Sequence, residues 1–397
     1  MKEPFATTKP ARDPRLDFFR GLTMLIIFIA HVPANSWNAF IPARFGFSSG
    51  AELFVFCSGF ASALAFGGSF LRRGWALGAA RILQRIWQIY WTQISLIVAL
   101  VALAAAIDRL LGRTDLTQQF GPLLADPERA LLGLATLTWQ PDYLDILPMY
   151  LFILALVPAM MALRALHSTL PFAAVAALYA LAWFTDIHLT GNPWNGAGWF
   201  LNPFAWQAIF FIGFFIAMKW LPVPRLGDRT LMLASAVILI ASVPLCFWGI
   251  LEHWPAMQEL RDSILPGATE KTNLHPLRIL HFLALAYVTL SLLDRRQTRL
   301  DGGAGHALIL IGRQSLACFV MSIVLARLAA AASDAAGQDQ VIVALINIAG
   351  FVGIFATTIA VGWFKGKPWA AAAREKPDDR DARPSRLAVH TRWREAS

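Results

Sequence analysis

Long apolar blocks separated by shorter polar connections make up most of the chain. The blocks run for about 18–25 residues, the length that an α-helix needs to cross ~30 Å of hydrocarbon. We expect helices at residues 16–33, 51–70, 82–107, 146–165, 169–185, 203–219, 229–250, 276–293, 306–330 and 340–364. The pattern therefore predicts an all-α, polytopic membrane protein, a bundle of about ten transmembrane helices.

The connections between these blocks divide the chain into three parts. Residues 1–15 form a polar segment ahead of the first helix, and residues 16–365 hold the transmembrane domain. Residues 366–397 are rich in Arg, Pro and Asp, a composition typical of a disordered tail. Within the domain the connections are short except for 108–145, 186–202 and 251–275.

The distribution of Lys and Arg predicts the orientation in the membrane, since basic residues gather in cytoplasmic loops. With the N-terminus inside, the inner segments hold 24 Lys and Arg residues and the outer segments hold seven. We therefore expect both termini to lie in the cytoplasm. The sequence has no internal repeat of the kind that marks inverted-symmetry transporters.

Composition supports the membrane interpretation and narrows the classes of function. Of the residues, 57% are hydrophobic and 15% are charged, whereas a soluble domain carries charge on about a quarter of its residues. The net charge of +9 comes from basic residues that flank the apolar blocks, so nucleic acid is not an expected partner. The three cysteines lie far apart in apolar blocks, and no metal-ligand or nucleotide-binding pattern occurs. We expect no metal and no bound cofactor.

Asp17, Arg20 and His31 are ionisable residues of the first predicted helix. A charge inside a membrane-spanning helix costs several kcal/mol, so each of these residues needs a structural or functional reason. Arg20 and His31 are eleven residues apart, which places them on one helix face, ~16 Å apart along its axis. A histidine can take a proton from a hydroxyl, and an arginine near the cytoplasmic end suits a phosphate-bearing donor. The alternative is structural: Arg20 reaches the headgroups beside Asp17, and His31 caps the helix at the interface.

The second predicted helix begins with Glu52, on the same side of the membrane as His31. A carboxylate there can orient the imidazole or stabilise its charge. The sequence Ser49-x-x-Glu52 is also a capping box, which places a carboxylate at the third helical position for local reasons. Both interpretations stay open.

Arginines gather on the cytoplasmic side, where the third predicted helix begins. Arg81 and Arg85 lie one turn apart there, and Arg313 lies in the cytoplasmic part of the ninth predicted helix. Together with Arg20 they are predicted to form a basic funnel for a polyphosphate such as coenzyme A. Ordinary positive-inside flanking is the alternative, although it explains Arg85 less well because apolar residues follow at once.

Residues suited to a sugar occur in three places on the outer face. Asp145 lies just before the fourth predicted helix, and Trp194 and Asn195 lie in the 186–202 connection, which has no Lys or Arg. Aromatic rings stack on the C–H face of a sugar, and amides bond its hydroxyls. His281, in the outer part of the eighth helix, is a further candidate. A helix N-terminus that favours a carboxylate and an ordinary aromatic belt are the structural alternatives.

Several of these residues together resemble a known family. Arg20-x10-His31, the segment 52–60 and the arginines before the third helix resemble the acyltransferase-3 superfamily of membrane acyltransferases. The segments 139–150, 199–207 and 312–316 resemble more narrowly the OpgC group, which is associated with succinylation of osmoregulated periplasmic glucans. The resemblance runs from about residue 12 to residue 365. It departs in one respect: the superfamily has its third-helix arginines three apart, whereas Arg81 and Arg85 are four apart, so which of them contacts the donor stays open.

The resemblance implies a membrane-bound O-acyltransferase of the bacterial inner membrane, with His31 as the catalytic base. It implies acyl-CoA as co-substrate, with succinyl-CoA as the expected donor, and a periplasmic glucan or another glycan as the acceptor. Membrane lipids and glucan-synthesis proteins are the other expected partners. Two alternatives are a transporter or flippase for a lipid-linked or anionic solute, and a non-catalytic subunit of a glucan-synthesis complex. A chain of coupling-ion carboxylates in mid-membrane would favour the transporter, and the apolar blocks hold almost none.

Overall fold

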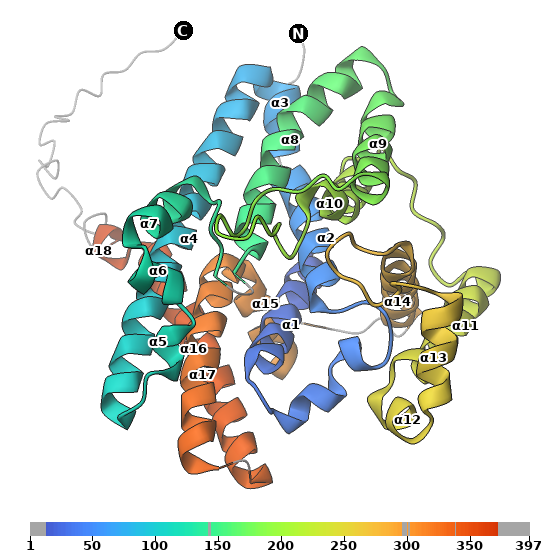
Figure 1. Cartoon of the computed structure of the whole chain (residues 1–397). Coiled ribbons are helices and arrows are strands. Elements are labelled where there is room, and N and C mark those ends of the chain that lie inside the picture. The colour runs from blue at the N-terminus through green and yellow to red at the C-terminus, as the bar shows by residue number, and fades with distance from the viewer. Residues whose placement is uncertain (1–12, 142–143, 296–299, 301, 338, 372–397) are drawn as a thin grey trace, which may run out of the picture.

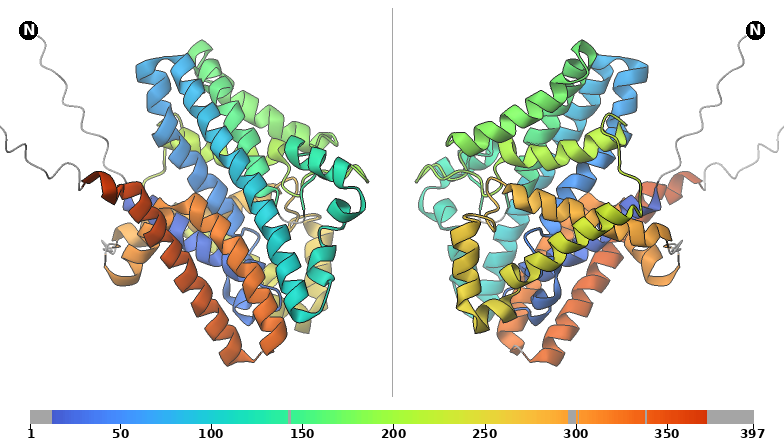
Figure 2. Two further views of the ribbon diagram at one scale, coloured as in Figure 1. Left: turned by 90° about the vertical axis from the view of Figure 1, so that its left-hand side faces the viewer. Right: turned by 90° about the vertical axis from the view of Figure 1, so that its right-hand side faces the viewer.

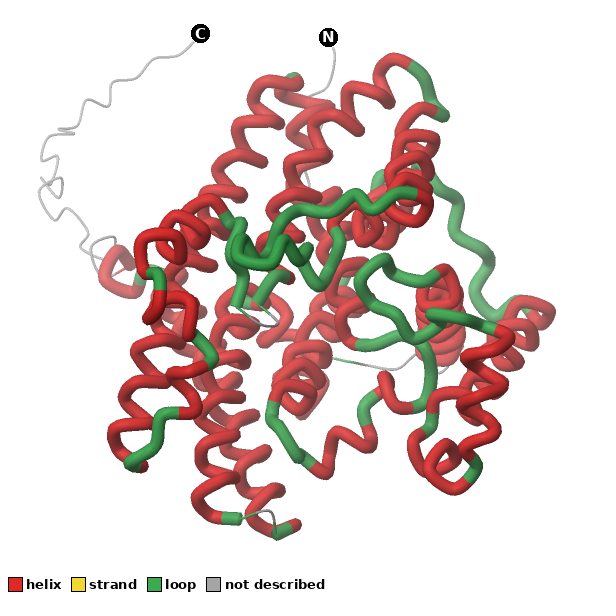
Figure 3. The backbone as a smooth tube through the Cα atoms, viewed as in Figure 1, coloured by secondary structure: helices red, strands yellow, loops and turns green. Residues whose placement is uncertain are grey.

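The protein, described here by a computed structural model, is a bundle of helices joined by loops (Figure 1). The structure describes residues 13–141, 144–295, 300, 302–337 and 339–371. Over these residues it contains helices and no strand (Figure 3). The predictions made for residues 1–12 and 372–397 lie outside the described residues.

The helices follow one another along the chain in a simple order. They are α1 (Pro14–His31), η1 (Ser36–Phe40), η2 (Pro42–Arg44), α2 (Gly50–Ser62), η3 (Ala63–Gly67), α3 (Gly68–Arg73), α4 (Trp75–Leu111), α5 (Asp115–Gln118), α6 (Gly121–Ala125), α7 (Pro127–Thr136), α8 (Ile146–Leu166), α9 (Leu170–Phe184), α10 (Pro203–Ala217), α11 (Arg229–Cys246), α12 (Trp248–His253), α13 (Pro255–Ile264), α14 (Pro276–Arg295), α15 (Gly303–Arg313), α16 (Ser315–Ala336), α17 (Gln340–Gly366) and α18 (Pro368–Ala371).

Seven helices of the described chain are long and apolar enough to cross a membrane. They span Gly50–Arg73, Trp75–Leu111, Ile146–Leu166, Arg229–Cys246, Pro276–Asp294, Ser315–Ala336 and Gln340–Gly366. The prediction of about ten transmembrane helices is not confirmed, because α1, α9 and α10 are not among the seven. α9 and α10 are apolar but shorter, and α1 carries the ionisable side chains of Asp17 and Arg20.

Three predicted stretches differ from the structure. The prediction of one helix over residues 229–250 is wrong, since α11 ends at Cys246 and α12 begins at Trp248. The prediction of one helix over residues 306–330 is wrong, since the chain breaks at Gln314 into α15 and α16. Gln314 has φ −111° and ψ 27°, and its side-chain oxygen accepts a hydrogen bond from Lys365 Nζ at 2.6 Å. The connection 108–145 contains three short helices, α5, α6 and α7, that the apolar pattern did not predict.

Helix α1 lies inside the bundle, where it packs against α2, α15, α16 and α17 (Figure 1). Its closest approach is to α15. A Cβ atom at Gly21 would overlap the carbonyl oxygen of Leu308, and one at Gly312 would overlap the carbonyl oxygen of Asp17. Two glycines therefore allow the backbones of α1 and α15 to touch, which brings the ionisable part of α1 against the break at Gln314.

One span contains an irregular turn. α2 continues into the π-helix η3, which is followed directly by α3. In a π-helix each N–H bonds to the carbonyl five residues back, so this turn holds one residue more than a regular α-helical turn. The guanidinium of Arg81 lies over the ring of Phe66, in η3, with its carbon Cζ 5.6 Å from the ring centroid.

The long helix α4 runs along the outside of the bundle (Figure 2). Its exposed face carries Leu83, Trp87, Trp91 and Val98, each with about half or more of its surface accessible. Exposed apolar side chains on a 37-residue helix indicate a face that lipid covers.

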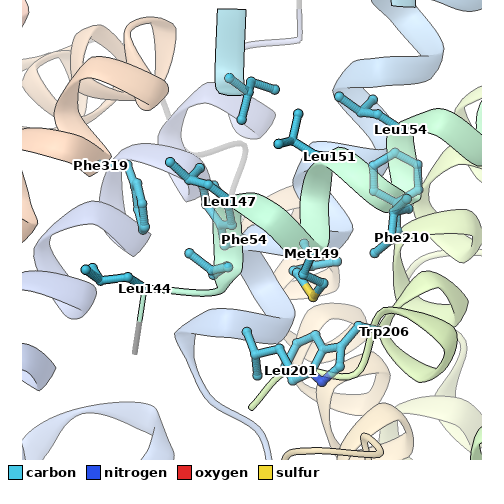
Figure 4. Close-up of a cluster of buried hydrophobic side chains, with 14 of the residues drawn as sticks. Phe54, Leu144, Leu147, Met149, Leu151, Leu154, Leu201, Trp206, Phe210 and Phe319 are labelled. Atoms are coloured by element: carbon cyan, nitrogen blue, oxygen red, sulfur yellow. The ribbon is translucent and has the colours of Figure 1, made fainter. Parts of the chain in front are cut away.

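The apolar core lies where α2, α8, α10 and α16 meet. Trp206 and Phe210 of α10 are fully buried, as is Met149 of α8, and Phe54 stacks on Phe319 with 5.5 Å between ring centroids (Figure 4). Leu144 and Leu201, which lie in loops, belong to the same buried cluster, so the core also holds those loops in place (Figure 4).

Three loops interlock at one end of this core. Gln140 N donates to Gly191 O at 2.8 Å, and Asn202 N donates to Thr272 O at 3.0 Å. Trp206 Nε1 also donates to Lys271 O at 2.8 Å. The segments 137–141, 144–145, 185–202 and 265–275 therefore form one connected cap, which we call the loop cap.

Candidate functional site

The end of α1 that carries His31 opens on a cavity of about 640 Å³, within the range of ligand sites. The cavity is lined by the end of α1, by residues 38–51 and by α16. The loop cap covers it through Leu144, Asp145, Leu201 and Lys271. We call this space the His31 cavity.

The imidazole of His31 is held in one orientation by its own helix. Its Nδ1 lies 2.7 Å from the carbonyl oxygen of Ile27, one turn earlier. A carbonyl oxygen only accepts, so the neutral ring carries its proton on Nδ1 and has its lone pair on Nε2. The side chain is exposed and lines the cavity, so that the basic nitrogen is accessible to a ligand there.

Glu52 is fully buried beside the cavity, and its carboxylate has other partners than His31. One oxygen accepts from Ser49 N and Ser49 Oγ, both at 2.7 Å, which completes the predicted capping box. The other accepts from Arg278 Nε at 2.7 Å in an ion pair that is buried on both sides. The hydrogen bonds resolved for Glu52 thus join the start of α2 to α14.

Cations dominate the cavity wall. Among the described residues that line it, the five basic side chains other than His31 are Arg44, Arg261, Lys271, Arg278 and Arg327, and the one carboxylate is Asp145. The sequence did not place these five among the predicted site residues, although Arg278, at the outer end of the eighth predicted helix, is a weaker candidate of the same kind as His281. A signal was available, because four of them are among the few basic residues on the predicted outer side, where the positive-inside rule disfavours them.

Asp145 lies in the cavity wall, as a residue that contacts an acceptor must. It is 3% exposed, and its Oδ2 accepts from Leu201 N at 2.6 Å. Burial raises the pKa of Asp145 above its ordinary value, while the hydrogen bond from Leu201, which favours the charged form, opposes that shift.

The other residues expected to bind an acceptor do not line the His31 cavity. Trp194 donates from Nε1 to Asp126 Oδ2 at 3.3 Å and packs edge-on against Trp139. Asn195 lines a second cavity of about 540 Å³, formed by residues 182–202 together with 272 and 273. His281 is buried, and its Nδ1 lies 2.7 Å from Ser48 Oγ beneath the chain at Gly46.

The opposite end of α1 brings two of the predicted donor-binding arginines together. Arg20 donates from Nη2 to Ser315 Oγ, at the first residue of α16. Arg313 lies across the same helix break, with its Nε 3.8 Å from Asp17 Oδ2. The contact between α1 and α15 and the break at Gln314 together create this cluster.

The two arginines of α4 have contacts of their own. Arg81 donates to Ser69 Oγ on α3, and Arg85 donates to Gln88 Oε1 at 3.3 Å. Arg81 is exposed and Arg85 is half-buried. The resolved contacts therefore connect Arg20 with the region of Arg313, and connect Arg81 with the α3 side of α4.

The comparisons with known proteins gave one finding. A family model described as "OpgC protein" matches residues 12–366, nearly the whole chain. The comparison with curated proteins and the comparison with solved structures gave no match.

Proposed function

The chain belongs to the OpgC family, which indicates a membrane glucan-modifying acyltransferase, and from this premise we propose that it transfers a succinyl group from succinyl-CoA to a glucan hydroxyl. The proposal includes the orientation predicted from Lys and Arg, with both termini in the cytoplasm and the loop cap in the periplasm. The membrane is then the bacterial inner membrane.

The observation that carries the proposal is the imidazole of His31, with Nδ1 bound to Ile27 O and Nε2 accessible from a cavity of ligand size. A base that removes a proton from a hydroxyl needs a fixed lone pair near the bound substrate. Ser49, a hydroxyl in the same cavity wall, donates to Glu52 rather than to His31. This arrangement favours direct transfer without a covalent enzyme intermediate.

The reaction has a simple balance. The glucan hydroxyl gives its proton to His31 Nε2, and its oxygen forms a bond to the thioester carbonyl carbon. The carbon–sulfur bond then breaks, and the coenzyme A thiolate takes the proton back from the imidazolium. His31 is unchanged at the end, and the products are the O-acyl glucan and coenzyme A.

The two ends of α1 suit the two ends of the donor. Arg20 and Arg313 lie at the helix break, where the phosphates of coenzyme A would bind as charge-assisted partners. Arg81 or Arg85 would add a further contact. The rise of an α-helix places His31 ~16 Å further along, so that the acyl group, and not the base, covers the distance across the bundle.

The acceptor would enter from the side of the loop cap. Asp145 lines the His31 cavity, and its carboxylate can accept a hydrogen bond from a sugar hydroxyl through Oδ1, since the bond from Leu201 N goes to Oδ2. Trp194 and Asn195 lie in the loop cap outside this cavity, where they would contact sugar units further along a polymeric glucan.

Purified protein incubated with labelled succinyl-CoA and glucan tests the proposal. Wild-type protein should transfer the label, and His31→Gln, which keeps hydrogen bonding at the helix end but cannot accept a proton, should lose ~10²–10⁴-fold in transfer rate. His253→Gln, on the exposed α12, is the matched control and should transfer normally. Substantial transfer by His31→Gln would exclude His31 as the base.

A further inference from the structure

The His31 cavity holds more positive charge than its own structure neutralises. Arg278 is paired with Glu52, Arg261 donates to Asp262 and to Leu245 O, and Arg327 donates to Gln119 Oε1 at 2.7 Å. Three of the five cations therefore have protein partners that fix them.

Arg44 and Lys271 are different. For neither side chain is a hydrogen bond or an ion pair to another described residue resolved, and both line the cavity. Lys271 is half-buried, and burial, followed by the nearby charge of Arg278, lowers the pKa of its ammonium. An ammonium that is partly desolvated among like charges is stabilised when an anion binds.

The backbone at Lys271 is fixed before any ligand arrives. Its carbonyl oxygen accepts from Trp206 Nε1 at 2.8 Å and from Leu274 N at 3.1 Å. The next carbonyl accepts from Asn202 N at the start of α10, and Tyr179 Oη donates to Leu274 O. A cation on such a rigid loop loses little entropy on binding a partner, as a specificity residue should.

The position of Arg44 and Lys271 in the molecule indicates which anion they bind. The phosphates of coenzyme A have their arginines at the opposite end of α1, ~16 Å away. The part of the donor that must reach His31 is the acyl group, because its carbonyl carbon is the atom attacked. An anion in the same cavity as the base is then a charge carried by the acyl group itself.

We infer that Lys271, together with Arg44, binds the free carboxylate of a dicarboxylic acyl group and so selects an acyl-CoA with an anionic tail. This inference rests on the proposed acyl transfer and adds the residues that set its donor specificity. Lys271 holds the carboxylate end while the thioester end lies at His31 Nε2, which positions the carbonyl for attack.

The test compares two donors with acyl groups of the same length, succinyl-CoA and the uncharged butyryl-CoA, on purified wild-type protein and glucan. Wild-type protein should favour succinyl-CoA in kcat/KM. Lys271→Met should lower the ratio of the two kcat/KM values about tenfold to a hundredfold, the effect of one lost charge-assisted contact. Lys271→Arg should keep most of the preference for succinyl-CoA. Arg44→Met, like Lys271→Met, should lower the ratio of the two kcat/KM values. Lys219→Met, on an exposed lysine two residues after α10, is the matched control.

The outcomes separate this inference from the proposed function. Transfer of succinyl by wild-type protein with an unchanged ratio in both Lys271→Met and Arg44→Met overturns the inference and leaves the acyltransferase intact. A raised KM for the glucan at an unchanged donor ratio also overturns it, because the cations would then bind an anionic acceptor. A wild-type protein that transfers neither acyl group overturns the proposed function, and the inference with it.

Discussion

Replacing Glu52 by Gln tests whether this carboxylate supports the fold or assists His31. The variant keeps the shape of the side chain but leaves the guanidinium of Arg278, which is 3% exposed, without its counter-charge. Breaking a buried ion pair by removing one partner costs about 3–5 kcal/mol. The N-cap bonds to Ser49 are weakened too, and a cap is worth ~1 kcal/mol. We expect Glu52→Gln to destabilise the protein by several kcal/mol and to lower transfer only as far as it lowers the folded fraction.

Chemical unfolding of the purified protein in detergent micelles measures this cost. Arg278→Met should be destabilising as well, whereas the double variant Glu52→Gln/Arg278→Met, which removes both charges, should recover much of the loss. Glu259→Gln, on an exposed carboxylate of α13, is the matched control and should change stability by no more than about 0.5 kcal/mol.

One result would refute the reasoning. If Glu52→Gln unfolds like wild-type protein but loses transfer, with the pH profile of the rate displaced, then Glu52 acts on the imidazole of His31 and not on Arg278. A double variant whose loss equals the sum of the two single losses would likewise show that the ion pair contributes no coupling energy.

Three further changes test other parts of the site. Arg20→Ala should raise the KM for acyl-CoA about tenfold to a hundredfold in steady-state assays, and an unchanged KM would return this side chain to a purely structural role. Because the folded-state pKa of Asp145 is raised, its contribution to stability is present at low pH and is lost as pH rises through that pKa. Asp145→Asn should therefore flatten this part of the pH dependence of unfolding. An unaltered pH dependence would contradict the raised pKa. In a cysteine-free background, Asn195→Cys should react with an impermeant thiol reagent from outside intact cells and Trp369→Cys should not, whereas protection of residue 195 would overturn the orientation.

Features that depend on one segment of sequence were predictable. The apolar blocks that form α8 and α17 were placed to within two residues at their ends, and the block that forms α4 to within seven, because their length and hydropathy are local properties. The capping box of Ser49 and Glu52 formed as its spacing predicts. The face shared by Arg20 and His31 follows from the helical period alone.

Features that depend on contact between distant segments were not predictable in this way. The break at Gln314 has no proline to mark it, and the residues around it contact Asp17 on α1 and Lys365 on α17. The cationic wall of the His31 cavity combines residues from η2, the loop cap, α13, α14 and α16. For His281, the helical period leaves open which neighbour its face meets, and packing turned it toward Ser48.

The π-helix η3 also affects how this chain can change in length. Deleting one residue from an ordinary membrane helix turns everything beyond it by about 100°, so buried and lipid-facing side chains exchange places. Deleting one residue within Ala63–Gly67 would instead let that turn relax to a regular α-helix, with α2 and α3 both kept in register. Ser69 would still meet Arg81, while Phe66 would lose its place beneath that guanidinium. Among the helices that the structure describes, η3 is thus the position at which an alignment of related sequences can open a one-residue gap without disturbing the packing on either side.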